Sequence, residues 1–525
     1  MIKKKFLSER GIFPGTLIVG ITLLIIFSDI GSFLKSYSQI GTFENSSSLM
    51  PQTETVTSYY DALLKIPLIV SQTAIVGVIF SHVFFQRVIR NKIQPDRNRD
   101  NNSTEIIDDI RSYLRPLKRL FIILLSGGIA VLISATSLFL LQALNLSSEL
   151  DMDIRTTFTI LTSTPVGPVW NIRVVTSLII IASSSLYYIF EKKSFTKKGQ
   201  RGLDSHDSNY FFSPMRKKTG KKGGVLSDSL LYVVLLAGAV SIFSNSMVSH
   251  NTALSFLPSL AISLDWFHFM AVSIWLGGLF YISSILIMTI KLSIGKNRNV
   301  SGAVSSSFDV RTVYDTSYFL ALLLPYFSLV ATISLGIIGV TGLYMGWIHL
   351  HTAEAIFTSS YGNILTIKLL LILPMVILGG YHQIRLHGSL MTVASLNKGN
   401  QKQQGEKINA YDMEEPSNER TKSPSPLKSD PSRKFGKTIK IESLIGVGVL
   451  VAASFLTITS PPSISLQESQ SSLEEEGQRE PSFNLFTILA IILSLAVIFG
   501  SFIYFKKSKK QLRNTVAFFE GVSNR

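Results

Sequence analysis

Apolar stretches of about twenty residues, separated by polar segments, follow one another along the whole chain. Each stretch is long enough to cross a lipid bilayer as a helix, which takes about 20 mostly apolar residues. The stretches cover residues 13–34, 62–85, 120–144, 171–190, 226–248, 263–286, 319–348, 363–381, 441–458 and 483–504. This pattern predicts an all-α fold, a polytopic membrane helix bundle with about ten transmembrane helices embedded in a lipid bilayer.

The charges of the connecting segments alternate in a way that predicts the orientation. Lys and Arg gather in residues 87–99, 192–222 and 506–510, whereas residues 149–153 and 474–476 are acidic. Cytoplasmic loops carry the excess of Lys and Arg, so we expect a protein of the cytoplasmic membrane with both termini inside. The formal net charge of +16 then follows from this orientation, and we expect no nucleic-acid partner.

Composition narrows the class of protein further. Hydrophobic residues make up 46% and charged residues only 16% of the chain, which is typical of a membrane protein. The absence of cysteine excludes disulfides, thiolate metal sites and thiol catalysis. The sequence also contains no nucleophile elbow, P-loop, dinucleotide glycine motif or zinc-protease motif, so we do not expect an enzyme.

Two segments that open membrane spans resemble each other and suggest an internal repeat. Residues 164–173 align with residues 359–368, which pairs Gly167 with Gly362 and Arg173 with Lys368. Each segment begins the third helix of a four-helix set, and an even number of helices per set gives parallel repeats. We therefore expect two four-helix repeats plus one extra helix at each end, with chance similarity as the alternative.

This organisation divides the chain into four expected parts. Residues 1–61 form a signal anchor, or a cleaved signal peptide, and an outer loop. The first four-helix set covers residues 62–250, and the second covers residues 251–462 with a polar, disordered inner loop at 390–437. Residues 463–525 hold an acidic outer linker, a last transmembrane helix and a basic tail.

The sixth stretch, residues 263–286, carries the polar side chains that matter most. Asp265, His268 and Trp275 fall on one face of a helix. Ionisable residues inside a membrane span are costly, and they usually face the protein interior or a wet cavity. This helix is therefore the first place to look for function.

Histidine and methionine recur around the outer ends of the central spans. Met247 and His250 are three residues apart, Met345 and His349 are four apart, and His351 follows. Together with His268 they form the predicted metal ligands, since imidazole and thioether are the donor set that suits copper, as Cu(I) or Cu(II). Asp265 is the expected acceptor for the second ring N–H of His268. Trp275 is expected, with Asp265, to support the ligands from the next layer of side chains. The alternatives are that each methionine fills apolar space and that Trp275 serves only packing.

Four further charged residues are expected to have structural roles. Arg173 or Lys368 is placed to pair with Asp265, with snorkelling to the interface as the alternative for each. Arg385 and Glu442 lie at the inner ends of two spans and are expected to form an ion pair. His382 and His387 lie nearby, but a separation of five residues does not place them on one α-helical face.

Several short motifs, taken in order, resemble the copper resistance protein D (CopD) family across residues 62–462. They are Ser249-His250, DWFH at 265–268, WLGGL at 275–279, PVGPVWNIR at 165–173, SYGNILTIK at 360–368, and the helix of Glu442 that ends in TSPP at 459–462. The resemblance implies an integral membrane protein of copper handling, which passes copper across the cytoplasmic membrane. It also implies a small outer copper-binding partner of the CopC type.

The leading hypothesis is a copper transport and copper resistance protein that captures the ion at the outer His/Met site. One alternative is a non-transporting factor that delivers copper to a membrane cuproenzyme or assists its assembly. A second is a b-type haem redox subunit, which needs histidines facing each other across a buried cofactor. His82 and His268 are expected in opposite leaflets, which disfavours the haem.

Overall fold

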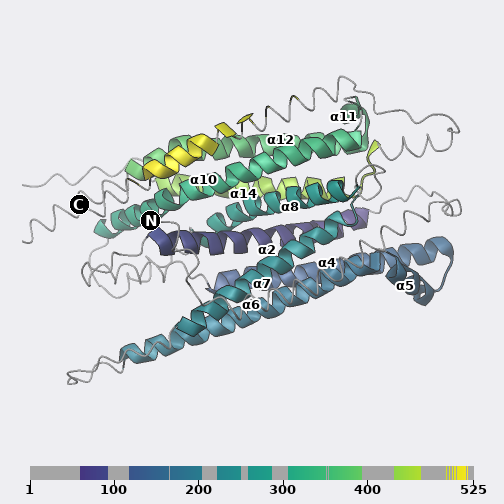
Figure 1. The fold of residues 1–525 in the computed structure, drawn as a ribbon, viewed down its shortest axis with the longest axis horizontal. Coiled ribbons are helices and arrows are strands. Elements are labelled where there is room, and N and C mark those ends of the chain that lie inside the picture. Colours follow the sequence, from purple (N-terminus) through teal and green to yellow (C-terminus); the bar gives the residue numbers. More distant parts are fainter. Residues whose placement is uncertain are drawn as a thin grey trace, which may run out of the picture. The chain divides into compact units, whose positions relative to one another are not determined.

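In the computed structural model the described residues form helices (Figure 1). The structure describes residues 59–92, 117–164, 166–203, 221–249, 258–286, 306–350, 352, 354–392, 431–462 and parts of 492–517. Within these residues there is no strand. The predicted all-α fold is confirmed.

Eight of the described helices are long and apolar enough to cross a membrane, and each coincides with a predicted span. Their helical segments are α2 (Tyr59–Lys92), α4 (Leu117–Leu150), α6 (Val166–Leu203), α7 (Lys221–Ser246), α8 (Pro258–Phe280), α10 (Ser306–Leu350), α12 (Ser360–Tyr381) and α14 (Pro431–Leu456). The predicted first span, at 13–34, lies outside the described residues, as do most of the last span, at 483–504, and most of the inner loop at 390–437.

The chain forms two compact units, and α2 contributes to both. The first unit holds residues 59–79 of α2 together with α4, the short helix α5 (Ile154–Ser163), α6 and α7. In it α6 packs against α4 and α7 (Figure 1). A polar network ties its helices together, because the Gln72 amide donates to Ser241 and accepts from Asn245, and Arg173 donates to Ser244 and Asn245.

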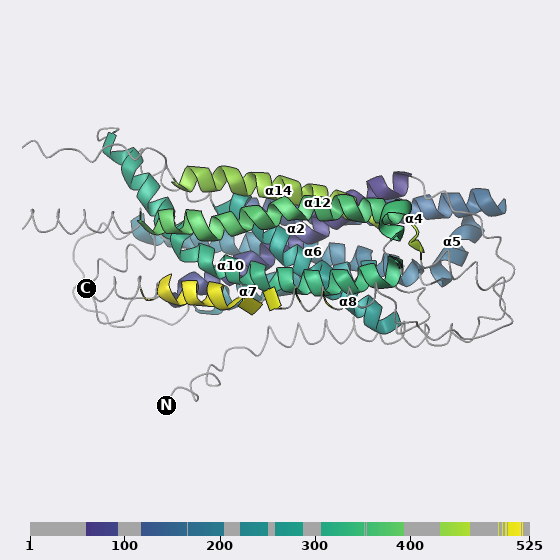
Figure 2. The ribbon, with the colours of Figure 1, turned by 90° about the horizontal axis from the view of Figure 1, so that it is seen from above.

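The second unit holds the end of α2, from Phe80, and the described residues after Thr252. Its main helix pairs are α8 with α10 and α12 with α14, and the second pair lies side by side in Figure 2. Residues 505–515 form a further helix whose Ser508 hydroxyl donates to Ser328 on α10. The predicted basic tail therefore belongs to the packed part of this unit.

A short helix precedes α6 in the first unit and α12 in the second. These helices are α5 and α11 (Ala355–Thr358), and each folds back on the long helix that follows. Gly167 and Gly362 make this possible, because a Cβ at Gly167 would overlap the backbone of Thr162, and one at Gly362 would overlap that of Ala355. The aligned glycines thus serve the same close approach in both segments.

Two π-helical segments interrupt the helices of the second unit. They are η4 (Tyr281–Leu286), which continues α8, and η6 (His382–Leu386), which continues α12. In a π-helix each N–H bonds the carbonyl five residues earlier, so the side chains change register, and such segments are frequent at functional sites.

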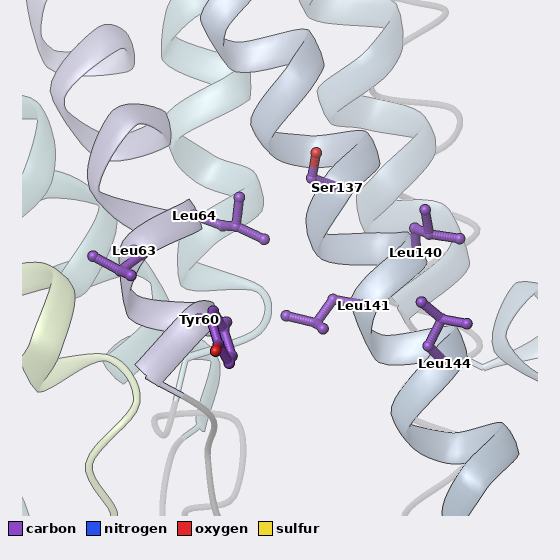
Figure 3. Close-up of a pocket in the computed structure, with 7 residues that line it drawn as sticks. All are labelled: Tyr60, Leu63, Leu64, Ser137, Leu140, Leu141 and Leu144. Carbon is purple, nitrogen blue, oxygen red and sulfur yellow. The ribbon is translucent and has the colours of Figure 1, made fainter.

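An apolar cavity of about 460 Å³ lies in the first unit between α2 and α4 (Figure 3). It is lined by Tyr60, Leu63, Leu64, Ser137, Leu140, Leu141 and Leu144. Its lining is almost entirely apolar, as expected of a surface that faces lipid chains.

Candidate metal site

His268 on α8 is held by one hydrogen bond that determines which ring nitrogen carries the proton. Its Nδ1 lies 2.9 Å from Oγ1 of Thr341 on α10. The Thr341 hydroxyl itself donates to the Ile337 carbonyl at 2.6 Å, so its oxygen accepts the Nδ1–H of His268. The neutral ring therefore keeps the lone pair on Nε2, which is the state in which imidazole binds a metal.

Gly342 gives the imidazole room against α10. A Cβ at this position would lie 3.3 Å from Cε1 of His268, closer than ordinary van der Waals contact allows. Thr341 and Gly342 therefore act together, because the threonine fixes the ring by a hydrogen bond and the glycine leaves it space.

Asp265 lies one turn before His268 and faces α12. It interacts electrostatically with Lys368 and with Tyr361, and Lys368 also acts on His268. Lys368 is thus the basic neighbour that α12 supplies to Asp265. We call Asp265, His268, Tyr361 and Lys368 the Asp265 cluster.

This arrangement corrects one expectation about Asp265. The sequence favoured its carboxylate as the acceptor for the second ring N–H of His268, whereas that proton goes to Thr341. The reason is that α10 places a hydroxyl directly against the ring, while Asp265 lies beside Lys368. Arg173, the other candidate partner, donates to Ser244 and Asn245 within the first unit.

The remaining predicted ligands are distributed over both units. His349 near the end of α10 is buried, and its ring meets Tyr361 edge-on at a centroid distance of 5.8 Å. Tyr361 therefore connects His349 with the Asp265 cluster. Met345 lies one turn before His349 and is half-buried, and Met247 is buried in the first unit. His250 and His351 lie outside the described residues.

The described residues contain no group of three or more His, Cys, Asp or Glu side chains that could hold a metal ion. The structure thus brings His268 and Asp265 together with Lys368 and Tyr361, and it connects His349 through Tyr361. The complete ligand set of His250, His268, His349, His351, Met247 and Met345 stays a prediction.

Trp275 lies two turns after His268 and is buried. The nearby Gly278 faces the ring of Phe327 on α10, which a Cβ there would overlap. Gly278 therefore packs closely against α10, and the role of Trp275 stays a prediction.

The other end of α12 carries a second set of polar side chains. Glu442 on α14 pairs with His382, whose Nδ1 lies 3.2 Å from its Oε2. Arg385 is not the partner of Glu442, because its side chain is on the exposed side of η6. The π-helix also places His382 and His387 on the same buried side, which an α-helical period does not predict.

His82 is a satisfied core histidine. It is fully buried, with Nδ1 3.2 Å from the Tyr281 hydroxyl and Nε2 2.9 Å from the Gln86 amide nitrogen. Both ring nitrogens are therefore engaged, and neither is available to an axial haem iron in this arrangement.

The family model described as copper resistance protein D (CopD) matches residues 321–411. The matched segment includes most of the α10 span, α11, α12 and η6, and so contains Thr341, His349 and Lys368. It is narrower than the 62–462 range that the sequence resemblance suggested, and it stops short of Asp265 and His268. No curated protein and no solved structure matches the chain.

The matched segment lies within a set of membrane-length helices. The match supports a membrane protein that is similar, over residues 321–411, to the copper resistance protein D family.

Proposed function

We propose that this protein captures copper at an outer His/Met site and passes it across the cytoplasmic membrane. The single observation that carries the proposal is the hydrogen bond from His268 to Thr341. It keeps a ligating lone pair on Nε2 of a histidine that lies inside a membrane span. Fixing the second ring nitrogen in this way is the usual support for a ligating histidine.

The electrostatic surroundings support entry of a cation. An acidic side chain at the centre of a membrane helix costs about 2.5–3.5 kcal/mol, so Asp265 needs a compensating role. Its interaction with Lys368 offsets that cost while no ion is bound. When a copper ion arrives beside His268, the carboxylate supplies the negative charge that stabilises it.

The other predicted ligands complete the proposed capture site. His349 and Met345 come from α10, the helix that also carries Thr341. His250, His351 and Met247 are further ligands that the sequence predicts, and a CopC-type protein is the proposed donor of the ion. Copper then moves along the helices of the second four-helix set, toward the end of α12.

Copper uptake into sealed vesicles that contain the full chain tests this function. We expect His268→Ala to lower uptake by at least tenfold. His206→Ala, in the predicted inner loop, is the matched control and should behave as wild type. Equal uptake by the His268→Ala and wild-type proteins would refute the assigned site.

The same preparation separates the alternatives. Stoichiometric copper binding without net flux would favour the copper-delivery or assembly factor. A Soret band in the purified protein would favour the b-type haem subunit. The hydrogen bonds at both ring nitrogens of His82 argue against this outcome.

A further inference from the structure

A buried group of polar side chains lies at the end of α12, far along that helix from Lys368. We call His382, Gln383, His387 and Glu442 the His382 cluster. Each of the four is at most 6% exposed. A carboxylate buried this deeply in a membrane span is a functional candidate by default, provided that its partner is known.

The π-helix η6 assembles this cluster. The His387 N–H donates to the His382 carbonyl, five residues earlier. On an α-helix residues five apart diverge by roughly 140° around the axis, whereas the π-helical turn brings them to one side. An α-helical period therefore predicts that His382 and His387 lie on different sides of the helix, whereas the structure places both on one side.

The hydrogen bonds of His382 determine how many protons the pair with Glu442 holds. The Thr438 hydroxyl lies 3.1 Å from both the Lys434 and the Phe435 carbonyls, to which it donates. Its oxygen therefore accepts from Nε2–H of His382, at 2.7 Å. Nδ1 lies 3.2 Å from Oε2 of Glu442, but the two atoms are not aligned for a hydrogen bond. Their lone pairs repel at this distance unless the pair carries one further proton.

That shared proton makes the pair electrically neutral. It is either an imidazolium with a carboxylate or a neutral imidazole with a carboxylic acid, and both descriptions hold the same number of protons. Release of this one proton leaves a net charge of −1. The site can therefore balance one positive charge that passes nearby.

One observation indicates that ordered water reaches the cluster. Neither polar atom of the buried Gln383 side chain has a hydrogen-bond partner in the protein. A buried amide without a protein partner calls for ordered water. The Gln511 amide, on the helix of residues 505–515, donates to His387 Nδ1 at 2.8 Å and to the Gln383 carbonyl at 3.2 Å, so this helix covers the same place.

Within the part of the chain that the structure describes, few other titratable side chains lie around the pair. His387 on the same segment and Tyr381, whose ring centroid is 6.3 Å from that of His382, face it from the α12 side. From α14 only Glu442 faces it, since Lys434 and Lys437 are exposed. Ala321 on α10 meets His387 through its backbone.

We infer that His382 and Glu442 form a proton-exchange site that couples copper movement to proton movement. This inference rests on the proposed transport function. As one Cu(I) ion passes toward the end of α12, the shared proton leaves to the water at Gln383, and it is regained once the ion has gone. One positive charge enters and one leaves, so the protein interior stays neutral.

A metal-ligand role for the pair is less consistent with its geometry. Both ring nitrogens of His382 are engaged, one by Glu442 and the other by Thr438. A ligating imidazole needs one nitrogen with a free lone pair. Proton exchange requires no such rearrangement.

The test uses full-length protein in liposomes loaded with a pH-sensitive dye, with Cu(I) supplied under a reductant. We expect about one proton to move against each copper ion taken up. An imposed pH gradient, acidic in the compartment that receives copper, should speed uptake, because protons then leave down their gradient as copper enters. Glu442→Gln keeps a hydrogen-bonding side chain but should abolish the proton signal, and exposed Arg385→Gln should retain it.

The outcomes separate the two proposals. Copper uptake without any proton movement, insensitive to the pH gradient, would overturn the coupling and leave the transport function standing. A proton signal retained in Glu442→Gln would overturn the assignment to this pair. No copper uptake by the wild-type protein would overturn both. The wild-type measurement alone decides the coupling if the variant does not fold.

Discussion

Nδ1 of His268 donates to the hydroxyl of Thr341, 2.9 Å away on the neighbouring helix α10. The two residues are 73 positions apart in the chain. The hydroxyl has already used its own proton on the Ile337 carbonyl, so only one tautomer of the imidazole satisfies both groups. A single contact between helices thus prepares Nε2 as a metal ligand.

Thr341→Val removes this acceptor and nearly preserves the shape of the side chain. Loss of a hydrogen bond that orients a ligand typically weakens metal binding by about 10–100-fold, and we expect a loss in that range. A competition titration with a Cu(I) chelator measures it. Thr341→Ser should restore most of the affinity, because the hydroxyl returns.

Thr332→Val is the matched control for this prediction. Thr332 is also a buried threonine on α10, but its hydroxyl donates only to its own helix, at the Ser328 carbonyl. We expect unchanged copper affinity. An equal loss in both variants would show that the effect comes from α10 as a whole rather than from the contact with His268.

Gly342→Ala tests the packing side of the same site. The added methyl group would lie 3.3 Å from Cε1 of His268, so the ring must shift by a few tenths of an ångström and strain its hydrogen bond with Thr341. We expect weaker copper binding with an intact helix, because alanine favours helix formation. Gly346→Ala, one turn further on, meets nothing within 4 Å and should bind copper as wild type does.

The membrane spans were predictable because they depend on a property that each segment carries alone. About 20 consecutive apolar residues suffice to cross a bilayer, whatever packs beside them, and eight predicted spans coincide with helices of the structure. The interaction of Asp265 with Lys368 was predictable only in part, because the aligned segments placed Arg173 and Lys368 alike and left both open as partners.

The residues that support the site could not be found in this way. Thr341 and Gly342 sit in an apolar stretch with nothing in their local sequence to show that His268 faces them. The His382 cluster was missed for a different reason. A helical period of 3.6 residues was assumed, and the π-helix at 382–386 breaks that period. Glu442 therefore finds His382 and not Arg385.

Asp265 and Lys368 should stabilise each other, and a double-mutant cycle measures by how much. Asp265→Asn and Lys368→Gln each leave one charge in the membrane without its neighbour, so each should lower the melting temperature in detergent. The double variant should recover part of the loss, with a coupling of about 0.5–3 kcal/mol. Strictly additive losses would mean that the two charges do not interact.

Lys368→Gln should lower the stability of the protein but raise its affinity for copper. The lysine acts electrostatically on His268, and a positive charge beside a ligand disfavours a bound cation. We expect tighter copper binding in this variant, by a few-fold. Lys434→Gln, an exposed lysine on α14, is the control and should leave affinity unchanged. Weaker binding in Lys368→Gln would assign the lysine a supporting role instead.

Substitution of Gly167 and of Gly362 tests whether the two aligned segments form the same junction between a short helix and the long helix that follows. In each, a Cβ would overlap the backbone of the preceding turn or short helix, at Thr162 and at Ala355. Backbone cannot yield as a side chain does, so alanine at either position should cost about 1–3 kcal/mol of stability. Gly388→Ala meets nothing within 4 Å and should be neutral or slightly stabilising. Thermal unfolding in detergent compares the three variants. Similar losses at the two aligned glycines are expected if the segments form the same junction, whereas a loss at only one would separate them.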